Sequence, residues 1–224
     1  METKPVIKDT KFDTVKFTFY FTYILLLTTG TITLIEALSS KNPRVRHIMN
    51  LETCISIVAG YFYSQFVDKV ATSNGVIDYK DINTTRYNDW FITTPLMLLA
   101  LMLALSYNKQ SVHATTYATA VLLNFGMLYS GYIGDKKTIT KPVACIIGFI
   151  FFIALFGLIY YNFVKGTTSF NFMLFGVYVF IWSLYGFVFL LDDEDKNITY
   201  NILDVTAKCF VGLGLWAYFT KILT

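Results

Sequence analysis

The chain has 224 residues, of which 55% are hydrophobic and only 15% charged, and its mean hydropathy is +0.53. This composition is typical of an integral membrane protein and argues against a soluble domain. The net charge is +3 and the basic residues form no run in the sequence, so no nucleic-acid partner is predicted. The cysteines and histidines show no ligand spacing, so neither a metal site nor a histidine-based enzyme is expected.

Seven stretches are apolar enough to cross a hydrocarbon core of about 30 Å, which requires about 20 helical residues. Short connections between them predict antiparallel neighbours in an all-α bundle. Because no repeat or low-complexity linker interrupts the chain, residues 1–224 are expected to form a single domain in membrane lipid. The predicted spans are 17–38, 47–67, 83–105, 112–134, 142–164, 168–191 and 197–220.

The longest connection, at 68–83, contains the dipeptide Asn74-Gly75 between β-forming residues. Asn-Gly in that setting is a signal for a type I′ hairpin turn. The predicted fold class is therefore a seven-transmembrane-helix bundle with a short β-hairpin between the second and third helices.

Four charges lie within the predicted spans, namely Arg86, Asp89, Asp204 and Lys208. A lysine in hydrocarbon costs roughly 3 kcal/mol on insertion scales, so such residues are rare and usually functional. Spacings of three and four place each acid on the same helical face as its cation. Two carboxylates against two cations would form a neutral cluster, which fits a structural link between helices as well as a functional site.

Aromatic side chains surround these charges in the sequence, including Tyr87, Trp90, Trp182 and Tyr185. Aromatic residues at helical spacing more often belong to a core than to a cofactor site. Together with a lone lysine amine, however, they could form a flat slot for a conjugated ligand bound as an imine.

Two motifs contain the four charges: residues 86–96 read R-Y-N-D-W-F-I-T-T-P-L, and residues 203–208 read L-D-V-T-A-K. The first resembles the third helix of the microbial rhodopsins, and the second resembles the seventh helix of that family. Residues 182–185, W-S-L-Y, resemble the sixth helix, and residues 124–127, N-F-G-M, the fourth. Their order and spacing extend the resemblance over all seven helices.

The resemblance implies that Lys208 binds all-trans retinal as a protonated Schiff base. Asp89 would be the primary counterion and proton acceptor, hydrogen-bonded by Thr93. Asp204 would be the second counterion, with Arg86 as neighbour of both acids on the extracellular side. The implied retinal-lining residues are Trp90, Thr94, Met97, Met127, Gly131, Trp182, Tyr185 and Phe189.

Two further positions follow from the same resemblance. The second-helix tyrosine that bonds the second aspartate matches Tyr63 best, with Tyr61 as the alternative. The tryptophan that the family carries on the fifth helix, over the ring of retinal, is missing, and Cys145 or a neighbour stands there.

The usual cytoplasmic proton donor of the third helix is replaced by Ala100. Glu52, on the second helix, is the alternative donor, unless it is an interfacial acid facing water or headgroups. This shift, with Glu36 and Arg46, resembles the pentameric group of viral rhodopsins and implies a homo-oligomer, with a pentamer favoured. Cys209 stands where the channel-forming viral rhodopsins are expected to have asparagine.

The leading hypothesis is a light-driven outward proton pump with its N-terminus extracellular and its C-terminus cytoplasmic. This orientation follows from motif order and overrules the lysine count of the loops, which favours the opposite one. A light-gated ion channel or a sensory photoreceptor is the alternative, suggested by the missing third-helix donor. A third possibility is a retinal-free seven-helix transporter that uses the Asp204–Lys208 pair.

Overall fold

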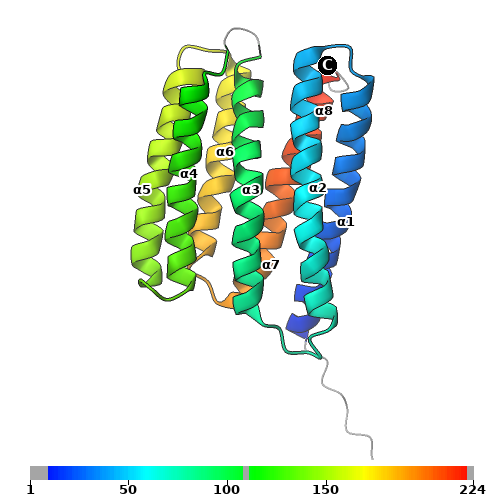
Figure 1. The fold of residues 1–224 in the computed structure, drawn as a ribbon, viewed down its shortest axis with the longest axis vertical. Helices are drawn as coiled ribbons and strands as arrows, with labels where there is room; N and C mark the ends of the chain where they lie inside the picture. The colour runs from blue at the N-terminus through cyan, green and yellow to red at the C-terminus, as the bar shows by residue number, and fades with distance from the viewer. Residues whose placement is uncertain (1–9, 108–110, 221–224) are drawn as a thin grey trace, which may run out of the picture.

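The computed structural model describes residues 10–107 and 111–220, and every regular element within them is helical. Seven antiparallel rods form the bundle, and two of them change helix type along their length (Figure 1). The first four rods are α1 (Thr10–Ser39), α2 (Pro43–Ala71), α3 (Tyr79–Leu105) and α4 (Ala114–Asp135). The last three are α5 (Lys141–Ile159) with η1 (Tyr160–Val164), α6 (Ser169–Val188), and α7 (Asp193–Asp204) with η2 (Val205–Phe210) and α8 (Val211–Phe219).

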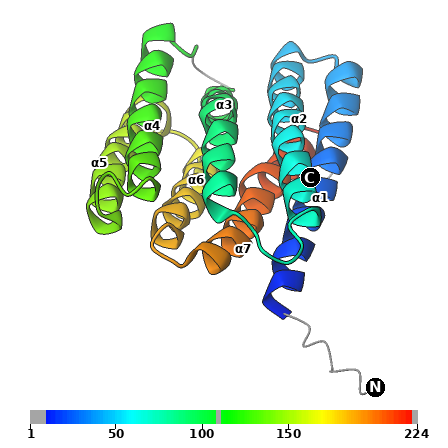
Figure 2. The same cartoon turned by 60° about the horizontal axis from the view of Figure 1, so that its bottom comes forward.

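The rods pack as neighbours in chain order, and α7 contacts both α1 and α6, which closes the bundle. In Figure 1 the turns after α2, α4 and α6 lie at the lower end, together with the start of α1. Figure 2 views the bundle with this end brought forward, and α3 and α7 lie between the α1–α2 pair and the α4–α5 pair. Side chains of α3 and α7 can therefore meet in the interior.

Local sequence explains where several helices begin. Asn42 precedes Pro43 at the start of α2, and its side chain accepts a hydrogen bond from the main-chain N–H of Arg44. The side chain of Asp78 accepts from the first main-chain N–H groups of α3, and Thr168 does so for α6. Such caps satisfy donors that the first helical turn leaves without a partner.

The predicted β-hairpin between the second and third helices is wrong. Only residues 72–78 separate α2 from α3, and no residue in this described connection is in a strand. The Asn-Gly turn itself is present, because Asn74 and Gly75 have φ angles of 50° and 88°. Val70 and Ala71 belong to α2, and only residues 76–78 follow the turn before α3 begins, so too few residues remain to pair.

The distribution of polarity is that of a membrane protein. Five helical segments are long and apolar enough to cross a membrane, although α2 and α4 are not among them. Leu38, Leu122 and Ile153 are 79%, 70% and 68% exposed, whereas Arg86 and Lys208 are each 1% exposed. The outer surface is thus apolar and the interior holds charge, which suits a bundle surrounded by hydrocarbon. The five segments are Lys11–Ser39, Tyr79–Leu105, Lys141–Val164, Ser169–Val188 and Asp193–Phe219.

Close packing of α4 against α5 depends on Gly134. A Cβ atom at this position would lie 2.5 Å from Cβ of Ala144 and 2.9 Å from Cζ of Phe189. We expect Gly134→Ala to lower the stability by about 1–3 kcal/mol, because the two helices must separate. The measurement is the midpoint of thermal unfolding in detergent.

Gly157→Ala is the matched control, because Gly157 lies on α5 with no atom within 4 Å of its added Cβ. Alanine there should leave the midpoint unchanged or raise it slightly. Equal midpoints for the two variants would show that the contact at Gly134 does not limit the packing.

Candidate functional site

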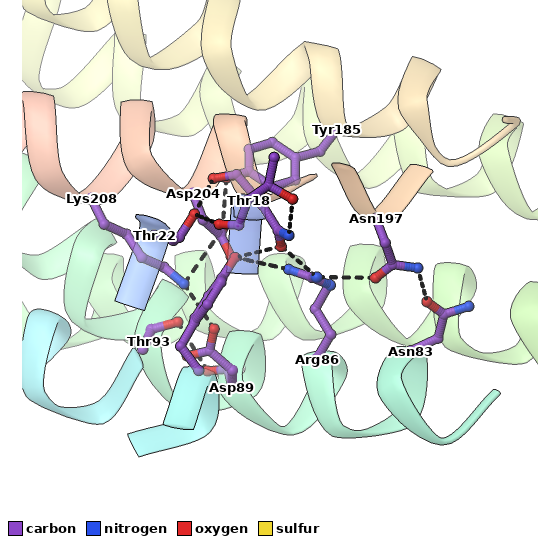
Figure 3. Close-up of polar contacts among 12 residues, drawn as sticks. Thr18, Thr22, Asn83, Arg86, Asp89, Thr93, Tyr185, Asn197, Asp204 and Lys208 are labelled. Atoms are coloured by element: carbon purple, nitrogen blue, oxygen red, sulfur yellow. Dashed lines mark hydrogen bonds and ion pairs between the residues drawn. The ribbon is translucent and has the colours of Figure 1, made fainter. Parts of the chain in front are cut away.

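Four buried charges alternate in sign at the centre of the bundle (Figure 3). Nζ of Lys208 lies 2.8 Å from Oδ2 of Asp89 and 3.4 Å from Oδ1 of Asp204. Nη1 of Arg86 lies 3.3 Å from Oδ2 of Asp204. These four side chains are at most 1% exposed, so each charge is stabilised by its neighbours rather than by water.

Helix geometry brings the four together. Arg86 and Asp89 are three residues apart on α3, and Asp204 is the last residue of α7. Lys208 lies in η2, a six-residue π-helical segment between α7 and α8. Single π turns inside α-helices are rare and frequently occur at functional sites.

Asp204 has a hydrogen-bond partner on each oxygen in addition to the cations. The Tyr63 hydroxyl donates to Oδ2 over 2.8 Å, and the Tyr185 hydroxyl donates to Oδ1 over 2.8 Å. The Tyr63 oxygen also accepts from Nη1 of Arg86 over 3.1 Å. Of the two tyrosines considered from the sequence, Tyr63 therefore meets Asp204, whereas Tyr61 is 63% exposed.

Asp89 is held by fewer partners than Asp204. Its Oδ2 accepts from Nζ of Lys208, and its Oδ1 has no hydrogen-bond partner among the described residues. Thr93 was expected to bond Asp89, and its hydroxyl donates to the main-chain carbonyl of Asp89 over 2.9 Å. Threonine hydroxyls in helices often form this bond to the carbonyl four residues earlier.

A chain of amides leads from Arg86 toward the lower end of the bundle. Nη2 of Arg86 donates to Oδ1 of Asn201 over 2.8 Å and to Oδ1 of Asn197 over 3.0 Å. Asn197 donates in turn to Oδ1 of Asn83 over 3.0 Å. The sequence analysis missed these asparagines, although Asn197, Asn201, Asp204 and Lys208 have the 4-3-4 spacing of one helical face.

An apolar cavity begins at Lys208 and extends between α3, α4, α5 and α6. It encloses about 790 Å³ of space between atoms, part of which is open to the outside. All eight residues expected to line a retinal slot line it, and Tyr63 does not. Its far end contains Cys145, Phe149 and Phe152, of which only Cys145 was anticipated. The eight are Trp90, Thr94, Met97, Met127, Gly131, Trp182, Tyr185 and Phe189.

Glu52 is 2% exposed and lies on the opposite side of Lys208 from Arg86. Gly212 comes one helical turn after Lys208, and a Cβ added to it would lie 2.9 Å from Oε2 of Glu52. Asp204, which pairs with Arg86, comes one turn before Lys208. Glu52 and Arg86 therefore lie on opposite sides of the lysine. Oε1 of Glu52 has no hydrogen-bond partner in the described part of the chain. The structure thus places Glu52 in the interior and not facing water or headgroups, and Ala100 is buried as well.

The fold and the site together define a class: seven-helix membrane proteins with a buried lysine, paired with acids, at the end of an aromatic cavity. A family model for bacteriorhodopsin-like proteins matches residues 12–222. The chain therefore belongs to the bacteriorhodopsin-like family, the microbial rhodopsins, and is an integral membrane protein.

Individual relatives agree with this assignment. Viral rhodopsin OLPVRII is 44% identical in its crystal structure, with a TM-score of 0.88 over 94% of this chain and 99% of that one. Bacteriorhodopsin-I of Haloquadratum walsbyi is 24% identical over 204 residues, which cover 80% of this chain and 76% of that protein. The light-driven proton pump of Coccomyxa subellipsoidea shares the fold, with a TM-score of 0.74 at 19% identity over 90% of this chain and 95% of that one.

The family implies a retinal chromophore, and the residues of this chain fit one. The cavity is largely apolar, and one primary amine, that of Lys208, lines it. Gly131 and Gly186 leave the cavity walls flat, since a Cβ on either would lie 2.7 Å from an aromatic side chain. The unpartnered Oδ1 of Asp89 leaves room for a further donor beside the amine.

The contact between Tyr63 and Asp204 can be tested by removing one oxygen. We expect Tyr63→Phe to destabilise the retinal-loaded protein by about 1–3 kcal/mol, because a buried carboxylate loses a donor. Tyr61→Phe on the exposed face of the same helix is the control and should have almost no effect. The measurement is the temperature at which the visible absorption band is lost. If both variants lose it at the wild-type temperature, the contact with Asp204 contributes little.

Proposed function

We propose that this rhodopsin is a light-driven outward proton pump. The observation that carries the proposal is the position of Lys208. Its amine lies between Asp89 and Asp204, and the buried acid Glu52, whose Oε1 has no hydrogen-bond partner among the described residues, lies on the other side of it. An acceptor and a donor on opposite sides of one nitrogen are what vectorial proton transfer requires.

Bound as a protonated Schiff base on Nζ of Lys208, all-trans retinal would supply light absorption and a change of shape that weakens the contact of this nitrogen with Asp89. Oδ2 of Asp89, 2.8 Å from Nζ, is the atom that would take the proton. Trp90, Trp182 and Tyr185 would hold the polyene flat and exclude water from the cavity.

The two acids differ in a way that assigns their roles. Both oxygens of Asp204 accept hydrogen bonds, from Tyr63 and Tyr185, and both lie near a cation. Hydrogen bonds to the charged form stabilise that form. Asp204 would therefore remain ionised as the second counterion, and Asp89, with one oxygen unpartnered, would accept the proton.

Reprotonation would come from Glu52, whose carboxyl group is buried on the Gly212 side of Lys208. In the orientation of the family, the Arg86 end of α3 is extracellular, so the N-terminus is extracellular and the C-terminus cytoplasmic. Arg86 would then guide the proton from Asp89 outward, and Thr93 would fix the backbone at Asp89.

We further propose that residues 1–224 form one domain and that the protein assembles as a homo-oligomer, with a pentamer favoured. The half-buried Glu36 and the exposed Arg46, which resemble the pentameric viral group, support the oligomer.

A light-gated ion channel or a sensory photoreceptor is the second candidate. It is favoured by Ala100, which is buried where the family's usual donor would lie and cannot carry a proton. Without an efficient donor, reprotonation would be slow and a long-lived intermediate would suit signalling better than transport.

Illumination of cells in unbuffered medium separates these functions. A pump acidifies the medium, and an uncoupler abolishes the change. Asp89→Asn should abolish acidification and shift the absorption band to the red, because the nitrogen loses its acceptor and a nearby negative charge. Lys208→Ala gives the baseline for cells without pigment. Wild-type acidification by Asp89→Asn would refute Asp89 as the acceptor, and no acidification by wild type would favour the second candidate.

Glu52→Gln tests the donor. We expect reprotonation of the Lys208 nitrogen to slow by about 100-fold, since a positioned proton donor is lost, and added azide to restore it. Flash spectroscopy measures the rate. Asp68→Asn on the exposed end of the same helix is the control and should leave it unchanged. An unaltered rate in Glu52→Gln would leave Glu52 without a role in transport.

A further inference from the structure

A second group of charges, centred on the buried Lys196, lies at the lower end of the bundle. Lys196 is fully buried, and its Nζ lies 2.9 Å from Oδ1 of Asp135 and 2.8 Å from Oδ1 of Asp193. The two acids come from the end of α4 and the start of α7. The side chain of Asp135 is 10% exposed and that of Asp193 is 51% exposed, so one buried ammonium pairs with a largely buried carboxylate and with a second one that also meets water.

This group is connected to the central charges by amides alone. From Arg86 the hydrogen bonds pass through Asn197 and Asn83, and Nδ2 of Asn83 donates to Oδ1 of Asp193 over 3.0 Å (Figure 3 shows the path as far as Asn83). An amide side chain has no proton to give up at ordinary pH. The first acids on this path beyond Asp204 are thus those held by Lys196.

A water-accessible funnel begins at this point, and Asp135 and Asp193 both line it. Tyr87 donates to Oδ2 of Asp135 over 3.3 Å. A third acid, Asp192, also lines the funnel, but the lysines that line it outnumber the acids. They add to the field of Lys196 and favour ionised carboxylates. These cations are Lys80, Lys136, Lys137 and Lys141.

We propose that Lys196 keeps Asp135 and Asp193 ionised, so that neither of these two acids stores a proton ready for release. The proton that reaches Asp89 then leaves the protein only after another has been taken up from the opposite side. Lys196 is in this account a positioning residue that sets the order of release and uptake. The inference rests on the proposed pump function.

The order of the two events is measurable with a pH-indicator dye after a laser flash on the purified pigment in detergent at neutral pH. For the wild type we expect the medium to become transiently alkaline and then to return, because uptake precedes release. Release before uptake would overturn the proposal for Lys196. No proton signal at all would instead refute the pump function, so the two failures are distinguishable.

Lys196→Met removes the ammonium and leaves the largely buried carboxylate of Asp135 without its cation at 2.9 Å, which favours the protonated form of that acid. We expect a protonated carboxyl band in the infrared spectrum of the dark state, and release that precedes uptake. Lys196→Arg retains the charge and should retain the wild-type order. The absence of the carboxyl band from a folded Lys196→Met protein would contradict the proposal.

Asp193→Asn keeps the proposal falsifiable if Lys196→Met does not fold. An acid that never carries the released proton can be replaced without changing the order of events, so uptake should still precede release. Asp135→Asn introduced together with Lys196→Met should abolish the new infrared band. A reversed order in Asp193→Asn alone would identify Asp193 as a release group and refute the role given to Lys196.

Discussion

The ammonium of Lys208 between two carboxylates is the interaction on which the rest of the structure depends. An isolated cation in this interior would be costly, and removing one partner of a buried pair typically costs 3–5 kcal/mol. Arg86 balances the second carboxylate, and hydroxyl and amide groups from α2, α6 and α7 form hydrogen bonds with Asp204 and Arg86. The packing of α3 against α7 thus serves to keep four charges within reach of one another.

The surroundings of Lys208 are unequal on its two sides. Toward Arg86 the interior is polar, with tyrosine and asparagine side chains in hydrogen-bonding contact as far as the funnel. Toward Gly212 the interior is mostly apolar, with Leu98, Ala100 and Leu101 among its core residues, and Glu52 stands there without a hydrogen bond at Oε1. Hydrogen-bonding side chains are thus dense on one side of the Lys208 nitrogen and sparse on the other.

Much of the site could be predicted because its residues are close in sequence. Asp204 and Lys208 lie one turn apart, and the motif around Arg86 and Asp89 identifies the family by itself. The prediction of a β-hairpin was wrong because the Asn-Gly dipeptide indicates only the backbone angles of the turn. It does not indicate how far α2 and α3 extend toward that turn. The group around Lys196 was missed because its acids come from α4 and α7, and charges near the ends of spans usually face water. Only the folded chain brings Asp135 to Lys196.

The ring of Tyr87 is a wall shared by two spaces, since it lines both the apolar cavity and the outer funnel. Its hydroxyl bonds Asp135, and its edge meets the ring of Trp90. Because one ring separates the two spaces, a tilt of Tyr87 that widens one of them narrows the other. The shape of the apolar cavity and the shape of the funnel are therefore linked through a single side chain.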